Sequence, residues 1–171
     1  MSQKNSLILL FIAASSALVF AYISQYFFGL QPCQLCHYQR VPFFLIILIL
    51  AANLRFKKLR NLAMPLCLLM LLINVVIAFY HVGVEQKIFA GLSSCSSNLN
   101  SFSNIDELRQ ALINAKAVRC DEPQFIFLNL SMAAWNLIYC SALALYLFLN
   151  LKSRTNIFRA IDQKQVNRSR K

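Results

Sequence analysis

The chain has 171 residues and a formal net charge of +11, and 58% of its residues are hydrophobic, including 14 Phe. With a mean hydropathy of +0.56, this apolar share exceeds what the core of one soluble domain needs and excludes an ordinary soluble protein. We therefore expect an integral membrane protein that forms a single domain over residues 1–171 and is embedded in a lipid bilayer.

Four apolar stretches are long enough to matter as membrane spans, at residues 7–28, 36–54, 62–82 and 125–151. A helix rises about 1.5 Å per residue, and the hydrocarbon layer is roughly 30 Å thick. The second stretch is the shortest, and it reaches about 28 Å only if the helix extends back to Cys36, which puts Arg40 near the headgroups. Short connections between the first three spans favour an all-α fold, an antiparallel bundle of four transmembrane helices.

Lys and Arg residues are divided unequally between the two sides of this bundle. Twelve of the 17 fall on the side of the termini, from Lys4, the 55–60 connection and the basic tail at 152–171, and five fall on the other side. Such an excess marks the cytoplasmic side, so we expect both termini in the cytoplasm of a bacterial cell and the chain in the inner membrane. This asymmetry accounts for the positive charge, and we expect no nucleic-acid binding. The first span, apolar up to Phe28, is too long for a cleaved signal core and should be retained.

The outer loop at 83–124 is the largest segment between spans, and it should face the periplasm, where disulfides persist. Its middle has apolar residues at helical spacing from Ile105 to Ala115, preceded by Ser103 and Asp106, which are typical of a helix N-terminus. The pattern predicts a short amphipathic helix in this loop. We expect this helix either to lie flat on the bilayer surface or to be a solvated loop helix that packs against no other element.

Two pairs of cysteines are expected on the periplasmic side. Cys33 and Cys36 form a Cys-x-x-Cys motif at the head of the second span, and Cys95 and Cys120 lie in the outer loop. Two pairs that face the same aqueous phase can exchange disulfides, which indicates redox chemistry. Alternatively, either pair is a static disulfide that stabilises its loop. Two further cysteines lie inside spans and are expected to act as small apolar side chains, Cys67 and Cys140.

Arg40 lies four residues after Cys36, on the same face of a helix that begins near Cys33. The partial positive charge at the start of that helix favours a thiolate by about 0.3 to 2 kcal/mol. The guanidinium of Arg40 would further stabilise a thiolate or the anionic form of a reduced electron acceptor. Arg40 could instead be an interface anchor whose side chain reaches the headgroups.

Cys33-Gln-Leu-Cys36-His-Tyr-Gln-Arg40, the four spans and the loop cysteines together resemble the DsbB family of membrane thiol oxidases that pass electrons to quinone. The resemblance covers nearly the whole chain. It implies that a reduced, DsbA-like periplasmic thiol oxidase is attacked through Cys95 and leaves its electrons on Cys95 and Cys120. It further implies that Cys120 exchanges with Cys33, that Cys36 engages the quinone, and that Arg40 stabilises the charged quinone species.

Weaker similarities occur in Tyr80-His81-Val-Gly-Val-Glu85 at the end of the third span and in Trp135-Asn136 in the fourth. By this resemblance His81 is expected near the quinone ring, although a hydrogen-bonded histidine at the membrane interface is an equal alternative. The sequence assigns no direct role to Glu85, and it does not separate ubiquinone from menaquinone.

Three other classes of protein compete with this interpretation. The residues Cys33, Cys36 and His37 also match the attachment signature of a c-type haem, with His37 as axial ligand. The four cysteines of the two pairs could form a structural zinc site, although their spacing lacks the usual second Cys-x-x-Cys and the outer compartment favours oxidation, so we expect no metal. A small-molecule transporter or a purely structural bundle is disfavoured, because the spans contain few charges and no matching Gly or Pro breaks.

Overall fold

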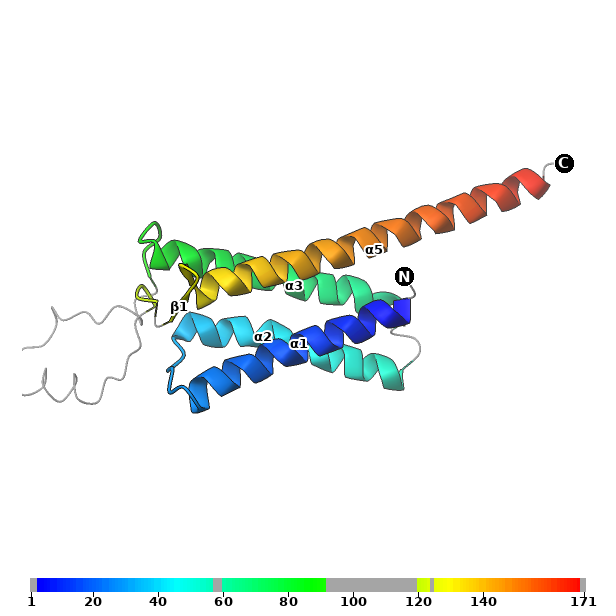
Figure 1. Cartoon of the computed structure of the whole chain (residues 1–171). Helices are drawn as coiled ribbons and strands as arrows, with labels where there is room; N and C mark the ends of the chain where they lie inside the picture. The colour runs from blue at the N-terminus through cyan, green and yellow to red at the C-terminus, as the bar shows by residue number, and fades with distance from the viewer. Residues whose placement is uncertain (1–2, 57–59, 92–119, 124, 170–171) are drawn as a thin grey trace, which may run out of the picture.

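The computed structural model describes residues 3–56, 60–91, 120–123 and 125–169 (Figure 1). Its elements are the helices α1 (Gln3–Tyr26), α2 (Gln34–Arg55), α3 (Arg60–Glu85) and α5 (Met132–Ser169) and the strands β1 (Ile126–Phe127) and β2 (Leu130–Ser131). All four helices contain a stretch that is long and apolar enough to cross a membrane. The predicted amphipathic helix of the outer loop lies outside the described residues.

The four helices pack as an antiparallel bundle, so the predicted all-α membrane fold is confirmed. Helix α2 packs against α1 and α3, and α3 packs against α5. Helices α1 and α5 are joined by hydrogen bonds from Tyr139 Oη to the Ala13 carbonyl oxygen, at 3.0 Å, and from Tyr146 Oη to Ser6 Oγ, at 3.3 Å. The two ends of the chain therefore lie at one end of the bundle, as Figure 1 shows.

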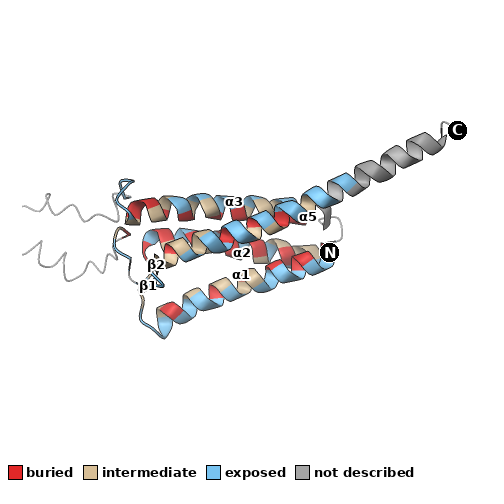
Figure 2. Ribbon diagram, turned by 45° about the horizontal axis from the view of Figure 1, so that its top comes forward, coloured by how far each residue is buried: buried red, intermediate tan, exposed pale blue. Residues whose placement is uncertain are grey.

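Buried side chains from all four helices form the core of the bundle. Its members face inward, while the outward faces remain exposed (Figure 2). The most deeply buried include Leu10, Ile46, Leu71 and Leu147. Large apolar residues also cover the outer surface, for example Ile12 and Leu48, which are more than half exposed. Apolar residues on both faces are what a bilayer requires, because the outer face of the bundle contacts lipid instead of water.

The fourth helix begins later than the predicted span of 125–151. Residues 126–131 form an antiparallel hairpin, in which Ile126 pairs with Ser131 and Phe127 with Leu130. The two turn residues have positive φ angles, 52° at Leu128 and 62° at Asn129, as a tight two-residue turn requires. Ser131 then caps α5, because its Oγ accepts a hydrogen bond from Ala134 N at 3.1 Å. An apolar run therefore continues through a strand before the helix starts.

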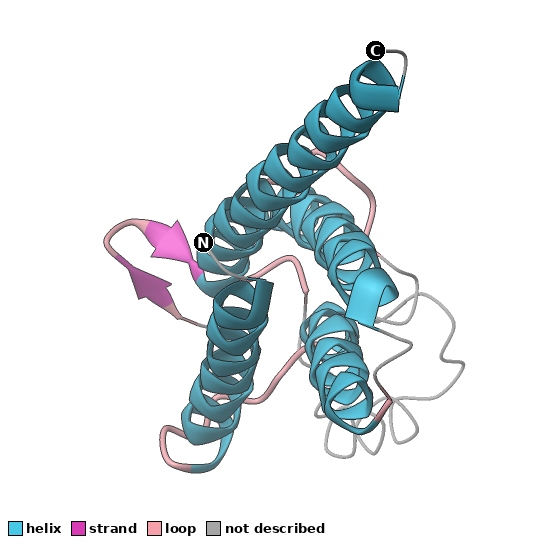
Figure 3. Ribbon diagram, turned by 90° about the vertical axis from the view of Figure 1, so that its right-hand side faces the viewer, coloured by secondary structure: helices cyan, strands magenta, loops and turns pink. Residues whose placement is uncertain are grey.

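Helix α5 also continues past the predicted span end at 151 and reaches Ser169. Its apolar, membrane-compatible part ends at Ser153, so the basic segment that follows extends the same helix beyond the rest of the bundle (Figure 1). Figure 3 views the bundle from the end that carries the termini, and shows the hairpin to one side of the helices. The opposite end, which holds Cys33 and the hairpin, is called the cysteine end below.

Candidate active site

Cys33 and Cys36 lie at the cysteine end, where helix α2 begins. Cys33 is the residue before the helix and caps it, since its Sγ accepts a hydrogen bond from Cys36 N at 3.4 Å. The two Sγ atoms are 3.1 Å apart, and the Cys33 thiol donates to Cys36 Sγ. Both residues are free thiols in the structure. The pair is thus placed for a two-electron oxidation to a disulfide.

Cys33 is the more deeply placed of the two, with 6% of its surface exposed. Its hydrogen bond to Cys36 and its burial raise the pKa of the Cys33 thiol to about 12, while a contact with His81 acts in the opposite direction. Cys33 is therefore protonated at neutral pH. A reaction that uses Cys33 as a nucleophile has to remove this proton.

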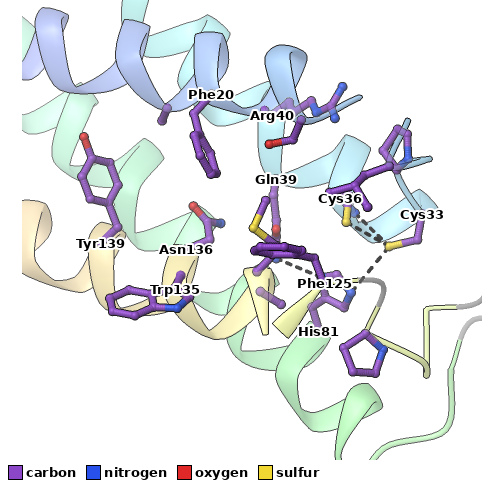
Figure 4. Close-up of a pocket in the computed structure, with 18 of the residues that line it drawn as sticks. Phe20, Cys33, Cys36, Gln39, Arg40, His81, Phe125, Trp135, Asn136 and Tyr139 are labelled. Atoms are coloured by element: carbon purple, nitrogen blue, oxygen red, sulfur yellow. Dashed lines mark hydrogen bonds between the residues drawn. The ribbon is translucent and has the colours of Figure 1, made fainter. Parts of the chain in front are cut away.

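His81 approaches the dithiol from helix α3. It is only 3% exposed, and its Nε2 lies 3.5 Å from Cys33 Sγ. Its other ring nitrogen, Nδ1, lies 3.2 Å from Nε2 of the buried Gln39, which comes from helix α2. Both ring nitrogens thus have partners, and the ring is held between two helices (Figure 4).

Glu85 lies one helical turn after His81, and its Oε1 is 3.7 Å from His81 Nε2. Its second oxygen, Oε2, accepts a short hydrogen bond from Ser131 Oγ. Ser131 is also the cap of α5, so Glu85 links the end of α3 to the start of α5. The carboxylate therefore lies beside the imidazole on one side and accepts a hydrogen bond from the hydroxyl on the other.

The side chain of Arg40 contacts two residues of helix α1, so it is more than an anchor in the headgroup layer. Its Nη1 donates to Gln25 Oε1 at 2.7 Å, and its guanidinium lies over the ring of Tyr22, 5.0 Å from the centroid. Tyr22 in turn stacks on Tyr26, with 6.2 Å between the ring centroids. These contacts hold the guanidinium of Arg40, which lines the same cavity as Cys36.

A cavity of about 540 Å³ opens beside the dithiol, and it is lined by all four helices and by the segment before β1. Its polar side chains include Cys33, Cys36, Gln39, Arg40, His81 and Glu85. Large apolar side chains form much of the remaining wall, among them Phe20, Phe43, Phe125, Trp135 and Tyr139 (Figure 4). Volume and lining are those of a site for a small, largely apolar molecule with a polar end.

Cys120 is the part of the second cysteine pair that the structure describes. It is 1% exposed and packs in one buried cluster with Cys33, Leu35 and Val84. The segment at 120–123 therefore brings a third sulfur to the dithiol. Cys95 lies outside the described residues, so its predicted pairing with Cys120 stays a prediction.

The remaining cysteines, Cys67 and Cys140, are fully buried in the core of the bundle. Five predicted residues thus gather at the cysteine end, namely Cys33, Cys36, Arg40, His81 and Cys120. Sequence reasoning missed Gln39, Gln25, Tyr22 and Ser131 as supporting residues. Gln39 carried a signal, because an amide near the start of an apolar span needs a polar partner when it is buried.

Cys33, Cys36 and His81 offer ligand atoms that all lie within 4.8 Å of one another, so they could hold a soft metal ion. This set differs from the four cysteines that the zinc alternative uses. For the haem alternative, the histidine beside the thiols is His81, while His37 is exposed. Metal analysis of the purified protein and its absorption in the Soret region test these two alternatives.

A membrane bundle that holds a dithiol beside an apolar cavity defines a class, that of membrane proteins with thiol–disulfide chemistry. Comparison with known families gives the same result in more detail. The family model described as "Disulfide bond formation protein DsbB" matches residues 3–150. The chain belongs to the DsbB family, and membership of this family implies a disulfide oxidoreductase activity.

Individual relatives are similar over most of their length. An uncharacterised protein, RP370, from Rickettsia prowazekii is 31% identical over 79% of this chain and 80% of its own. A protein named Disulfide bond formation protein B from Xylella fastidiosa is 32% identical over 79% of this chain and 82% of its own. Another with that name from Pseudoalteromonas atlantica is 28% identical and covers 90% of this chain and 91% of its own.

Proposed function

We propose that this chain reoxidises a soluble, DsbA-like thiol oxidase of the periplasm and passes the electrons to a membrane quinone. In the net reaction the dithiol of the partner becomes a disulfide, and the quinone takes up two electrons and two protons to become a quinol. One observation carries the proposal: the Cys33–Cys36 pair lines an apolar cavity whose wall also carries Arg40. Sulfur that must exchange with a soluble partner and an acceptor that dissolves in lipid can meet only at such a place.

The exchange steps proposed here follow the family pattern. Electrons of the partner enter through Cys95 and the Cys95–Cys120 pair, and Cys120 then exchanges with Cys33. The buried cluster that contains Cys33 and Cys120 supports this order, because disulfide exchange requires the attacking and the attacked sulfur to meet. Reduced Cys33 and Cys36 then return to the disulfide when their electron pair leaves through Cys36.

The residues of the cavity fit a quinone. Phe20, Trp135 and Tyr139 offer flat apolar surfaces for a ring and its isoprenoid chain, and Arg40 offers charged N–H donors for an oxygen. When bound, ubiquinone or menaquinone supplies a two-electron acceptor that diffuses in the bilayer. Arg40 is prepared for this task, because Gln25 and Tyr22 already hold its guanidinium before any charge develops.

The proposed orientation places both termini in the cytoplasm and the cysteine end on the periplasmic side of the inner membrane. It rests on the 12 Lys and Arg residues that flank the termini and the 55–60 connection, against five elsewhere. In this orientation the thiols face the compartment in which disulfides persist. Labelling of Cys33 and Cys36 from either side of sealed membrane vesicles tests it.

The function is tested by quinone-dependent oxidation of a reduced DsbA-like protein in membranes that contain this chain. Cys36→Ser should abolish turnover, because the sulfur that hands over the electrons is gone. Arg40→Met should raise the KM for quinone about tenfold, the effect of about 1.4 kcal/mol of lost binding. Cys140→Ala serves as the matched control and should retain turnover. Equal rates in wild type, Cys36→Ser and Arg40→Met would refute the proposed site.

A further inference from the structure

Cys33 has to act as a nucleophile in order to close the Cys33–Cys36 disulfide, and a buried thiol needs a base to do so. Building on the proposed function, we propose that His81 Nε2 accepts the proton of Cys33 in this step, and that Glu85 is the positioning residue that holds the imidazole for it. His81 is thereby a catalytic residue of disulfide closure, in addition to any contact with the electron acceptor.

The need for a base follows from the surroundings of Cys33. The nucleophile in disulfide chemistry is the thiolate. Because the pKa of Cys33 is raised to about 12, the thiolate is about one part in 10⁵ at pH 7. A neighbour that takes the proton as the new S–S bond forms removes this barrier. His81 Nε2 is the nitrogen in position, 3.5 Å from Cys33 Sγ.

The other ring nitrogen of His81, Nδ1, has Gln39 as its partner, and this amide can serve both the neutral and the protonated ring. Gln39 lies 3.2 Å from Nδ1, and the amide can present either its oxygen or its NH₂ group at this place after a half-turn. With the oxygen toward the ring, Nδ1–H donates to Gln39, and Nε2 is free to accept the proton of Cys33. The same bond persists in the imidazolium that results.

Glu85 provides the negative charge that an imidazolium in this place requires. Its Oε1 is 3.7 Å from His81 Nε2, on a helix where residues one turn apart face the same way. Ser131 donates to the other oxygen and fixes the carboxylate in this orientation. Because water is largely excluded here, a carboxylate at this distance has a larger effect than it would have in solution.

Other titratable and charged groups also face this site. Arg40 and Glu122 lie on the wall of the same cavity, from α2 and from the segment at 120–123, and Cys36 and Cys120 adjoin Cys33. None of these offers the nitrogen base that lies in contact with Cys33 Sγ. The pair formed by His81 and Glu85 is therefore the route for the proton of Cys33.

Cys33 Sγ forms a bond to Cys36 Sγ, and the bond between Cys36 Sγ and its previous partner, the oxidant that had added to this sulfur, breaks. That partner leaves with the bonding electron pair and is thereby reduced, while the two sulfur atoms become a disulfide. The proton of Cys33 moves to His81 Nε2. In the complete reaction the oxidant is the membrane quinone of the proposed function.

The step can be measured without quinone by using an aromatic disulfide reagent. The full chain in detergent carries Cys95→Ser and Cys120→Ser, so that Cys33 and Cys36 are the thiols of the site. 5,5′-Dithiobis(2-nitrobenzoate) is added in slight excess. One thionitrobenzoate anion is released when Cys36 is modified, and a second when Cys33 displaces the remaining group. The rate of the second release, followed by absorbance, reports attack by Cys33.

His81→Ala should slow the second release about a hundredfold, which is the size of effect that a general base has. Added imidazole should restore several-fold of the loss, because it can occupy the space of the missing ring. Glu85→Gln, which keeps an acceptor for Ser131, should slow the release about tenfold, and Glu85→Asp should recover part of it. The matched control is His37→Ala, an exposed histidine next to Cys36, which should close at the wild-type rate.

An unchanged second release in His81→Ala would overturn the proposal. So would a loss that imidazole does not restore together with equal rates in Glu85→Gln and Glu85→Asp, because that pattern is the mark of a merely structural role. The result is independent of the proposed function. If wild-type protein closes its disulfide with help from His81 but never reduces quinone, quinone is refuted as the electron acceptor, while His81 is supported as the base.

Discussion

Two groups of cysteines lie in one bundle but in different surroundings. At the cysteine end, the Sγ atoms of Cys33 and Cys36 are 3.1 Å apart, and His81 Nε2 lies 3.5 Å from Cys33 Sγ. In the core of the bundle, Cys67 and Cys140 lie in an apolar cluster, where Cys140 Sγ also donates to Asn136 Oδ1 at 3.5 Å. The sulfur is the same in both places, so its chemistry depends on the neighbours. A partner sulfur, an imidazole and an apolar cavity occur together at the cysteine end.

Buried polar residues show the same contrast. Gln39, His81, Glu85 and Ser131 form a continuous chain of contacts at the cysteine end. In the middle of the bundle, Asn74 is 0% exposed, and neither polar atom of its side chain has a hydrogen-bond partner among the residues that the structure describes. A satisfied polar chain can hold a proton in a defined place, whereas an isolated amide only costs stability.

The largest expected effect comes from exchanging one sulfur in each group. Cys33→Ser should reduce quinone-dependent oxidation of a DsbA-like partner by at least about a thousandfold, since a serine hydroxyl cannot form the disulfide. Cys67→Ser should keep turnover within about threefold, because this sulfur serves only as a small buried side chain. Rates are measured in membranes at equal protein amounts. A comparable loss in Cys67→Ser would erase the contrast between the two regions.

A second effect is a tenfold change per pH unit in the labelling of Cys33. Its pKa is raised to about 12, so the thiolate fraction increases tenfold with each unit up to that value. The initial rate of alkylation, read by mass spectrometry of the Cys33 peptide, should therefore rise without a plateau between pH 7 and pH 10. An ordinary thiol would level off above about pH 9. A plateau for Cys33 near pH 9 would show that its surroundings do not retain the proton.

A smaller effect is expected when the hydrogen bond between Gln25 and Arg40 is removed. Gln25→Leu removes the oxygen that accepts from Arg40 Nη1 at 2.7 Å, but leaves the stacking on Tyr22 in place. The guanidinium then samples more orientations, and the KM for quinone should rise about threefold, equivalent to about 0.7 kcal/mol, with kcat nearly unchanged. Gln34→Leu, on the exposed side of α2, is the control. A fall in kcat at constant KM would assign Gln25 a different role.

The smallest effect is expected in the middle of the bundle. Asn74→Leu replaces a buried amide that has no hydrogen-bond partner in the described part of the chain by an apolar side chain of similar size, so the free energy of unfolding should stay constant or rise by about 1 kcal/mol. Turnover should be unchanged. Thermal unfolding in detergent and the oxidation assay measure the two quantities. A marked loss of activity would mean that this amide belongs to the working site.

Much of the fold could be predicted because the bilayer sets it. Four apolar runs of sufficient length leave few arrangements, and the described helices follow those runs. The start of the fourth helix could not be read from hydropathy, since Phe125 to Leu130 are as apolar as the helix that follows. A tight turn at Leu128 and Asn129 and the cap at Ser131 decide the boundary, and both are local conformational effects.

The candidate site was predictable where its residues are close in sequence. Cys33, Cys36 and Arg40 share one helix start, so their spacing alone brings them together. His81 lies 48 residues from Cys33, and its contact with that thiol depends on the rotation of α3 about its axis, which hydropathy does not specify. The hydrogen bond between Glu85 and Ser131 also depends on how two helices pack, and no sequence pattern predicts it.

We propose above that the Cys33–Cys36 dithiol gives its electron pair to a quinone in the adjoining cavity. The direct measurement is a single turnover without oxygen, in which the reduced protein in lipid nanodiscs is mixed with a stoichiometric amount of ubiquinone or menaquinone. We expect one quinol for each Cys33–Cys36 disulfide formed with at least one of the two quinones, and no quinol with Cys36→Ser. Disulfide formation without quinol, or equal quinol from Cys36→Ser, would contradict transfer of electrons from this dithiol to quinone.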